Sequence, residues 1–288
     1  MRNEHNLRAR FRSATDSAAT GLAVLSTILV IAPLVAIFVY LIYKGASSLT
    51  PSFFTQIPKP PGENGGGMAN AIAGSAILLA VGSLMGVPLG IGGGIFLAEF
   101  GRGTKLANAV RFTADVLNGV PSIVMGIAVY ALVVVPQKHF SAFSGGVALG
   151  IMMIPTICRT TEEMLLMVPH AVREAALALG VPNWRSVLSI TVKTASPGII
   201  TGCMLAFARV AGETAPLIFT ALGNQFWSAN LNEPIAALPL QIWVYAMSPY
   251  DEWHRLAWAG SLVLIVLIVA AVSLVRYVTS RGVLKGAS

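Results

Sequence analysis

The sequence predicts an all-α polytopic membrane protein with six transmembrane helices. Of its 288 residues, 55% are hydrophobic and only 11% are charged, whereas a typical soluble domain carries about 25% charged residues. The apolar residues also come in blocks of about 20 or more, the length that a helix needs to cross a ~30 Å hydrocarbon core. We expect the six spans at about residues 21–43, 70–97, 114–136, 146–163, 197–222 and 256–278.

The first span, residues 21–43, contains no charged side chain. A basic tail at residues 1–20 precedes it, as in a secretory signal peptide. The apolar stretch is longer than the about 7–15 residues of a signal peptide's apolar region, and no A-x-A cleavage site follows it. We therefore interpret residues 1–20 as a cytoplasmic tail in front of an uncleaved first span.

The second span, residues 70–97, is rich in glycine and contains Pro88. Small residues let membrane helices approach closely, so this span should lie inside the bundle, with a kink at the proline. The connection before it, residues 44–69, is rich in proline and glycine and should be irregular. No phosphate-binding loop of the form G-x4-G-K-[ST] is present, so hydrolysis of ATP would need another subunit.

Polar residues mark the third and fourth spans. Asp115, Asn118, Pro121 and Ser122 open the third, where they form either a helix cap with a kink or part of a gate. The fourth span is short and contains a proline. Arg159 lies near its inner end and is either a topological anchor or a residue of a transport path.

Two short helices are expected between the fourth and fifth spans, at about residues 169–192. In the first of them Glu174 lies near the helix start, where the helix dipole favours an anion, and Ala175 and Ala176 keep one face thin. Gly180 suits the position just beyond the helix end. The second helix, at about 183–191, should carry one apolar face formed by Trp184, Val187, Leu188 and Thr191. The unit would fit a groove on a partner, or would merely cap the bundle.

Arg209 lies in the middle of the expected fifth span, where an arginine costs about 2.5–3.5 kcal/mol. Glu213 follows four residues later, on the same helical face. The two side chains either neutralise each other in the bundle, or Arg209 faces a water-filled path and binds an anion. A guanidinium matches the oxygens of phosphate or sulfate in a bidentate way. Gly212 and Pro216 would loosen the helix there.

The loop at 223–255 is too short for a domain and rich in aromatic residues: Phe226, Trp227, Trp243, Tyr245, Tyr250 and Trp253. Anchoring at the membrane interface is the first interpretation, and a docking surface for a solute-binding protein is the alternative. Residues 236–243 would lie at the membrane surface or dip into it. The sixth span follows, and residues 279–288 form the C-terminal tail.

The basic residues indicate the orientation. With the N-terminus inside, fourteen of the 19 Lys and Arg residues lie inside and Arg209 lies within a span, which leaves four outside: Lys44, Lys59, Lys138 and Arg255. The positive-inside rule then puts both termini and the 169–192 segment in the cytoplasm. The basic tail would contact anionic lipid. Nucleic acid is not an expected partner, because no basic patch with interleaved aromatic residues is present.

The sequence does not predict an enzyme or a metal site. Cys158 and Cys203 both fall in apolar spans without metal-ligand neighbours, so small packing residues are the simplest reading. The spans contain neither H-E-x-x-H nor a nucleophile–base spacing, and all four histidines lie in tails or loops.

Glu174, Ala175, Ala176, Gly180 and Ile190 have the spacing of the EAA loop of ABC-importer permeases, E-A-A-x3-G-x9-I-x-L-P, and this run resembles that loop up to its terminal Leu-Pro, which is Val-Lys here. Four further runs resemble segments of phosphate-transport permeases, in the family's order: 66–74 (G-G-M-x-N-A-I-x-G), 115–126 (D-x-L-x-G-V-P-S-I-V-x-G), 159–162 (R-T-T-E) and 209–217 (R-x2-G-E-T-A-P-L). The missing terminal proline favours the permease type that commonly lacks it over the PstC-like type.

The resemblance implies a MetI-like type I ABC-importer permease over residues 21–278 in the bacterial cytoplasmic membrane, acting in phosphate import. It implies a heterodimer with a PstC-like permease, a PstB-like ATPase dimer that uses ATP and Mg, and a PstS-like phosphate-binding protein. No cofactor is expected on this chain. The resemblance also implies a path role for Arg159, Arg209 and Glu213, and ATPase coupling through the EAA-like loop. A permease for another oxyanion, or a non-conducting structural or signalling subunit, are the alternatives.

Overall fold

The computed structural model describes residues 2–63 and 65–285. In these residues five helices are long and apolar enough to cross a membrane, or six if a bent helix pair counts as one span. The helical membrane class and the number of spans agree with the prediction. The only bridge between extended residues in the described part of the chain is an isolated one that joins Leu222 to Ile235.

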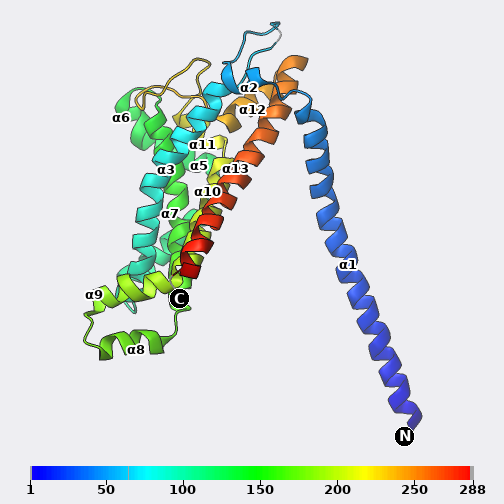
Figure 1. The fold of residues 1–288 in the computed structure, drawn as a ribbon, viewed down its shortest axis with the longest axis vertical. Coiled ribbons are helices and arrows are strands. Elements are labelled where there is room, and N and C mark those ends of the chain that lie inside the picture. The colour runs from blue at the N-terminus through cyan, green and yellow to red at the C-terminus, as the bar shows by residue number, and fades with distance from the viewer. Residues whose placement is uncertain (1, 64, 286–288) are drawn as a thin grey trace.

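The elements follow in a simple order (Figure 1). They are α1 (Arg2–Ala46), α2 (Pro51–Thr55), α3 (Ala69–Ile95), the π-turn η1 (Phe96–Phe100), α4 (Lys105–Gly119), α5 (Ser122–Val129), η2 (Tyr130–Val134), α6 (Val135–Gln137), α7 (Ala142–Leu166), α8 (His170–Ala178), α9 (Asn183–Ser186), η3 (Val187–Thr191), α10 (Val192–Ala211), α11 (Ala215–Thr220), α12 (Leu238–Ala246) and α13 (Asp251–Lys285).

The helix α7 forms the centre of the bundle. Its prediction as a short fourth span at 146–163 was too narrow: the helix has 25 residues, and 72% of its most apolar window is buried. It packs along α3 through the stripe Gly82, Gly86, Gly90 and Gly94, which recurs every fourth residue and is buried. A Cβ at Gly86 would lie 2.8 Å from the carbonyl oxygen of Gly150 on α7. The expected place of the glycine-rich span inside the bundle is confirmed.

The third predicted span, 114–136, is wrong as a single helix. The chain enters it already at Lys105, and α4 meets the α5–α6 segment at an angle of 111°. The break lies at Val120 and Pro121, both of which have extended backbone, with ψ of 132° and 136°. Proline has no N–H for the helical ladder, and its ring disfavours helical backbone at the preceding residue, so the helix ends there.

The fifth predicted span, 197–222, is also broken. The helix α10 ends at Ala211, and α11 begins at Ala215 after a short non-helical connection. Pro216 lacks the N–H that would reach Gly212 in a continuous helix. Toward the other end, α10 is continuous with η3 and α9, so this span begins at Asn183 rather than at 197.

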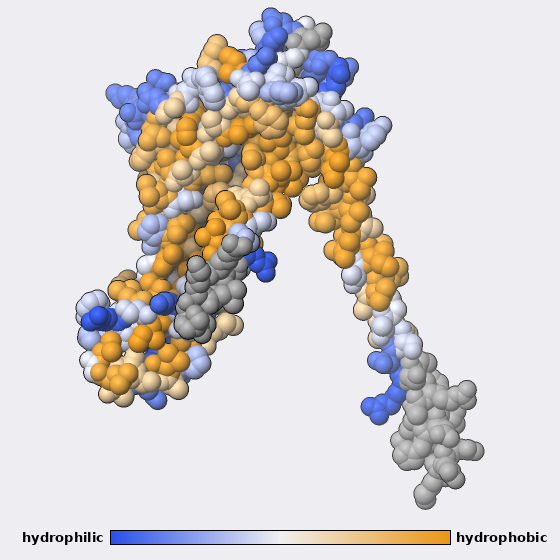
Figure 2. Space-filling model, in the orientation of Figure 1, coloured by the Kyte–Doolittle hydropathy of each residue, from blue (hydrophilic) through white to orange (hydrophobic). Residues whose placement is uncertain are grey.

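The helix α1 stands apart from the bundle along most of its length (Figure 1). It runs without interruption through the predicted tail 1–20 and the span 21–43, and none of its most apolar window is buried. It meets α13 at its C-terminal end, where the rings of Tyr40 and Trp258 lie edge to face at 5.2 Å. Hydrophobic residues cover most of the visible face of both α1 and the bundle (Figure 2).

The two ends of the bundle differ in content. The start of α1, the end of α13 and the helices α8 and α9 lie toward one end, and α2, α6 and α12 lie toward the other (Figure 1). The predicted 236–243 segment overlaps α12, which runs to Ala246 and packs on α13 and α3. The Leu238 N–H donates to the Ser75 hydroxyl at 2.7 Å. Of the loop's aromatic residues, Tyr245 is buried and stacks on Trp253 at 4.6 Å.

The glycine stripe yields a stability prediction. Gly86→Leu should destabilise the protein by about 1–3 kcal/mol, because the new side chain would meet the α7 backbone in an already close-packed contact. The measurement is the loss of the monodisperse size-exclusion peak after heating the detergent-solubilised protein. Gly92→Leu is the matched control, since a Cβ there has no neighbour within 4 Å. Equal losses in both variants would contradict a packing role for the stripe.

Candidate functional site

A cluster of charged side chains joins α4 to α7 near the end of the bundle that carries α8. Glu162 of α7, whose side chain is 4% exposed, accepts from Arg111 Nε at 2.6 Å with one carboxylate oxygen and from Arg159 Nη1 at 2.7 Å with the other. Arg159 Nε also lies 3.0 Å from Asp115 Oδ1. We call Arg111, Asp115, Arg159 and Glu162 the α4–α7 ionic network.

The network changes the interpretation of two residues that the sequence had singled out. Arg159 was interpreted as an anchor or a path residue, and in the structure its guanidinium is shared between Glu162 and Asp115. Asp115, a gate candidate, is its second partner. Two guanidiniums and two carboxylates balance in charge, so the desolvated Glu162 is compensated. Removing one partner of such a buried pair typically costs about 3–5 kcal/mol.

The other gate candidates lie at the break between α4 and α5. Asn118 Oδ1 accepts from the Thr156 hydroxyl of α7 at 2.9 Å, one turn beyond Asp115. Pro121 is exposed and precedes α5, and Ser122 is the first residue of that helix. Of the two interpretations of these residues, the kink is present, but no side chain caps α5, and the gate stays a prediction.

Two of the sequence runs described above meet in space. Gly126 of α5 packs on Pro216 of α11, and a Cβ at this glycine would lie 2.6 Å from the Pro216 Cα. The run 115–126 and the run 209–217 are therefore in direct contact. The broken third span and the broken fifth span touch beside their breaks.

Arg209 lies in the last turn of α10, two residues before the helix ends, and its side chain is exposed. The prediction of a mid-span position is wrong, because the helix stops at Ala211, whereas the predicted loosening at Gly212 and Pro216 is confirmed as a break between α10 and α11. Glu213 lies beyond that end, so the helical i,i+4 relation between the two residues does not hold. Among the described residues neither side chain takes part in an ion pair. The position suits a cation, since a helix C-terminus carries partial negative charge.

The 169–192 segment begins with the predicted helix and turn. The helix α8 starts after Pro169, and Gly180 follows its C-cap with φ of +77°, a left-handed conformation that favours glycine. The Gly180 N–H donates to the Leu177 carbonyl at 2.9 Å, and the Val181 N–H donates to the Ala176 carbonyl at 3.2 Å. This pair of bonds is a Schellman motif, which satisfies the free carbonyls of the helix end.

Glu174 does not lie in the first turn of α8. It is the fifth residue of a helix that begins at His170, so the helix dipole does not explain it, and the prediction on that point is wrong. Glu174, Ala175 and Gly180 are exposed, Ala176 is buried and Ile190 is half-buried. Leu179, beside Gly180, is 84% exposed.

The second helix of this segment is not separate. Residues 183–186 continue through the π-turn η3 into α10. A π-turn has one residue more per hydrogen-bonded ring than an α-helix, and this changes which side chains share a face. Val187 and Thr191 are buried, whereas Trp184 and Leu188 are exposed. The prediction that these four residues form one apolar face is therefore wrong.

Arg173 ties α8 to the bundle. Its Nη2 lies 2.7 Å from Glu99 Oε1 of η1, the turn that continues α3, and donates to the Leu165 carbonyl. Its Nη1 donates to the Val168 carbonyl. Both side chains of this pair are largely buried, at 13% and 8% exposed. Sequence reasoning assigned no role to Arg173 or Glu99. The available signal was Glu99 itself, a single acid directly after a long apolar span.

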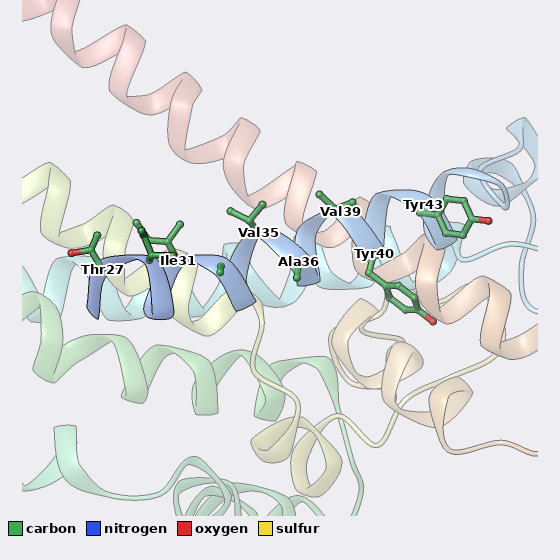
Figure 3. Close-up of a pocket in the computed structure, with 9 residues that line it drawn as sticks. Thr27, Ile31, Val35, Ala36, Val39, Tyr40 and Tyr43 are labelled. Carbon is green, nitrogen blue, oxygen red and sulfur yellow. The ribbon is translucent and has the colours of Figure 1, made fainter. Parts of the chain in front are cut away.

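The cavities of the described chain are apolar. A groove of about 720 Å³ runs along one face of α1, where Thr27, Ile31, Val35 and Tyr43 point outward from a single helix (Figure 3). Two smaller cavities, of about 300 and 480 Å³, lie among α3, α10 and α13. None of these three cavities is lined by Arg159, Arg209 or Glu213.

Cys158 and Cys203 are free thiols. Over residues 2–63 and 65–285, no group of three or more His, Cys, Asp or Glu side chains is placed to hold a metal ion.

Known proteins share both the sequence and the fold. Residues 90–282 match the model of the family described as binding-protein-dependent transport system inner membrane component. The chain is 49% identical over 238 residues to the phosphate transport system permease protein PstA of Yersinia pestis, covering 83% of this chain and 81% of that one. It is 44% identical over 268 residues to PstA of Haemophilus influenzae, covering 93% and 95%.

A solved structure of the MetNI methionine ABC transporter, in an inward-facing conformation, superposes with a TM-score of 0.57. The match covers 77% of this chain and 97% of that one at 19% identity, and at this identity it shows the fold alone. The predicted MetI-like fold and the predicted resemblance to phosphate permeases are both confirmed. The chain belongs to the binding-protein-dependent transport system inner membrane component family, as a multi-pass permease of the inner membrane.

Proposed function

We propose that this chain is one permease subunit of an ATP-driven phosphate importer and forms half of the translocation path. The observation that carries the proposal is the 49% identity, over 83% of the chain, to a permease protein of a phosphate transport system. An exposed arginine at a helix end in the permease domain adds chemical support, because a guanidinium binds oxyanions through a planar pair of donors.

The 169–192 segment, which we now call the docking segment, would bind a PstB-like ATPase dimer. Glu174, Ala175 and Gly180 are exposed on it, and Leu179 and Trp184 add apolar surface. Exposed apolar side chains around a fixed helix turn are typical of a surface that enters a partner's groove. ATP and Mg would be bound by that partner, and this chain would hold no cofactor.

The transport path would use Arg209 as its anion ligand. Its side chain is exposed beside the break after α10, and Glu213 lies half-buried just beyond it. Arg159 is engaged by two carboxylates, so its role in the path would be to hold the α4–α7 ionic network together. Asp115, Asn118, Pro121 and Ser122 would form the gate at the break between α4 and α5.

The other proposed partners are a second permease and a phosphate-binding protein, because this chain would form only half of the translocation path. The exposed apolar residues of α4 and α5, including Phe112, Ile123 and Ile127, would face a PstC-like permease across the path. A PstS-like protein would deliver phosphate to the end opposite the docking segment. Both termini and the docking segment would then lie in the cytoplasm, in accord with the distribution of basic residues.

Glu174→Arg should release the ATPase subunit. The substitution reverses a charge on the exposed face of α8 and leaves the helix ends and the buried Ala176 unchanged. Membranes that contain the variant with its partners should retain at most about a tenth of the wild-type ATPase subunit, the effect of about 1.4 kcal/mol in binding. Glu163→Arg, an exposed charge reversal at the end of α7, serves as the control. Full retention in the Glu174 variant would place docking elsewhere.

Arg209→Gln should abolish uptake while the complex stays assembled. The variant keeps hydrogen-bonding capacity but loses the charge and the fork, so ATP-dependent uptake of labelled phosphate into vesicles should fall about tenfold or more. Arg255→Gln, an exposed arginine at the start of α13, is the matched control. Normal uptake by the Arg209 variant would show that the anion path does not use this residue.

The same vesicles test the alternatives. Excess sulfate should leave phosphate uptake unchanged, and strong competition would assign the permease to a broader class of oxyanions. Absence of ATP-dependent uptake in a fully assembled wild-type complex would instead indicate a structural or signalling subunit.

A further inference from the structure

A continuous series of polar contacts leads from the docking segment to the break in the third span. Arg173 of α8 pairs with Glu99 of η1 at 2.7 Å. Two residues before Glu99, the carbonyl of Leu97 accepts from Arg111 Nη2 of α4 at 3.1 Å. Arg111 then opens the α4–α7 ionic network, which ends at Asp115, five residues before the break at Val120.

We propose that Arg173, Glu99, Arg111 and Glu162 are positioning residues that transmit movement of the docking segment to the break between α4 and α5. The inference rests on the proposed function, because it requires an ATPase subunit to move that segment. It extends that function by assigning the coupling to particular side chains, distinct from the exposed residues of the docking segment and from Arg209.

The contact between Arg173 and Glu99 should resist separation, because breaking it would leave a buried charge without a partner. Arg173 contacts Glu99 of η1, the Leu165 carbonyl of α7 and the carbonyl of a residue just beyond that helix. One guanidinium therefore holds α8 to the ends of two long helical segments. Moving α8 alone would leave the carboxylate of Glu99, 8% exposed, without its partner. A buried unpaired charge is strongly unfavourable, so α8 and the end of α3 should move together.

The second link continues across three helices. Charge-assisted hydrogen bonds are shorter and stronger than neutral ones, particularly where the surroundings have a low dielectric constant. Glu162 receives two of them, from Arg111 and Arg159, at 2.6 and 2.7 Å. The ends of α3 and α4 and the last two turns of α7 therefore form one unit with α8.

The first pliable point beyond this unit is the break itself. Val120 and Pro121 have extended backbone and no helical ladder between them. Beyond the break, Gly126 packs on Pro216, which lies three residues after Glu213. A rotation of α4 against α5 would thus reach the connection between α10 and α11, next to Arg209, through contacts that are all present in this chain.

The test measures whether ATP moves the break, without reference to the substrate. A cysteine at Ile123, on the face of α5 that would line the path in the proposed importer, is labelled with a maleimide in vesicles that contain the assembled complex, with and without ATP plus vanadate. The chain without this cysteine gives the background from Cys158 and Cys203. With the contacts intact, nucleotide should change the labelling rate at least about fivefold, the lower range of typical coupling between sites.

In Glu99→Gln this nucleotide-dependent change should disappear, while the ATPase subunit stays on the membrane and continues to hydrolyse ATP. Adding Asp115→Asn should have no further effect, because residues of one route are not additive. Glu252→Gln, in the exposed pair with Arg255 on α13, is the control and should behave as wild type. If Glu99→Gln does not accumulate, Arg111→Lys applies the same test, since lysine keeps the charge but not the fork.

An unaltered labelling change in Glu99→Gln or Arg111→Lys overturns the inference, and so does loss of the ATPase subunit in either variant, because the contacts would then serve assembly. Phosphate uptake in the same vesicles separates the two proposals. Nucleotide-dependent labelling without uptake in the wild type would remove the proposed function and leave the coupling route. Phosphate uptake, together with a labelling change that these substitutions leave unaltered, would support the proposed function and remove the coupling route.

Discussion

The close contact between α3 and α7 determines where the charged groups near α8 can meet. Glycine at every fourth position of α3 allows the two backbones to approach within van der Waals distance, and in a membrane such packing replaces the hydrophobic effect as the source of helix association. Because the helices run side by side to their ends, Glu99 and Glu162 lie in one layer of the bundle. Bulkier residues in the stripe would move Glu99, the partner of an arginine of α8, away from Glu162, the partner of an arginine of α4.

Proline residues have two different structural roles in this chain. Pro169 precedes α8 and fixes where the helix begins. Pro121 and Pro216 interrupt membrane spans, and the two interruptions contact each other through Gly126. Irregular backbone at membrane depth is tolerated where protein or a water-filled cavity surrounds it. In the proposed importer, the paired breaks would therefore make polar backbone groups available to a transported ion.

Much of this arrangement could be predicted from the sequence. The apolar blocks, the glycine stripe and the residues that end α8 are local signals, each of which has one physical consequence. The ion pairs could not be predicted, because Arg111 and Glu162 are 51 residues apart and Arg173 and Glu99 are 74 apart. Their pairing depends on how three helices end together. The dipole argument for Glu174 failed for a different reason: the helix begins where it was expected, but the dipole acts only over the first turn, and Glu174 lies beyond it.

The π-turn η3 determines how the helix that follows it, α10, is rotated about its own axis. A π-turn accommodates one extra residue in a helix. In an α-helix, each residue is rotated by about 100° around the helix axis relative to the one before it. Twenty residues of α10, with Arg209 near their end, inherit their rotational phase from this turn. Removing a single residue between Val187 and Thr191 would make the helix regular and swing the guanidinium about a quarter of a circle away from its present bearing. The orientation of Arg209 relative to the surface that carries Glu174 therefore depends on the one extra residue in η3.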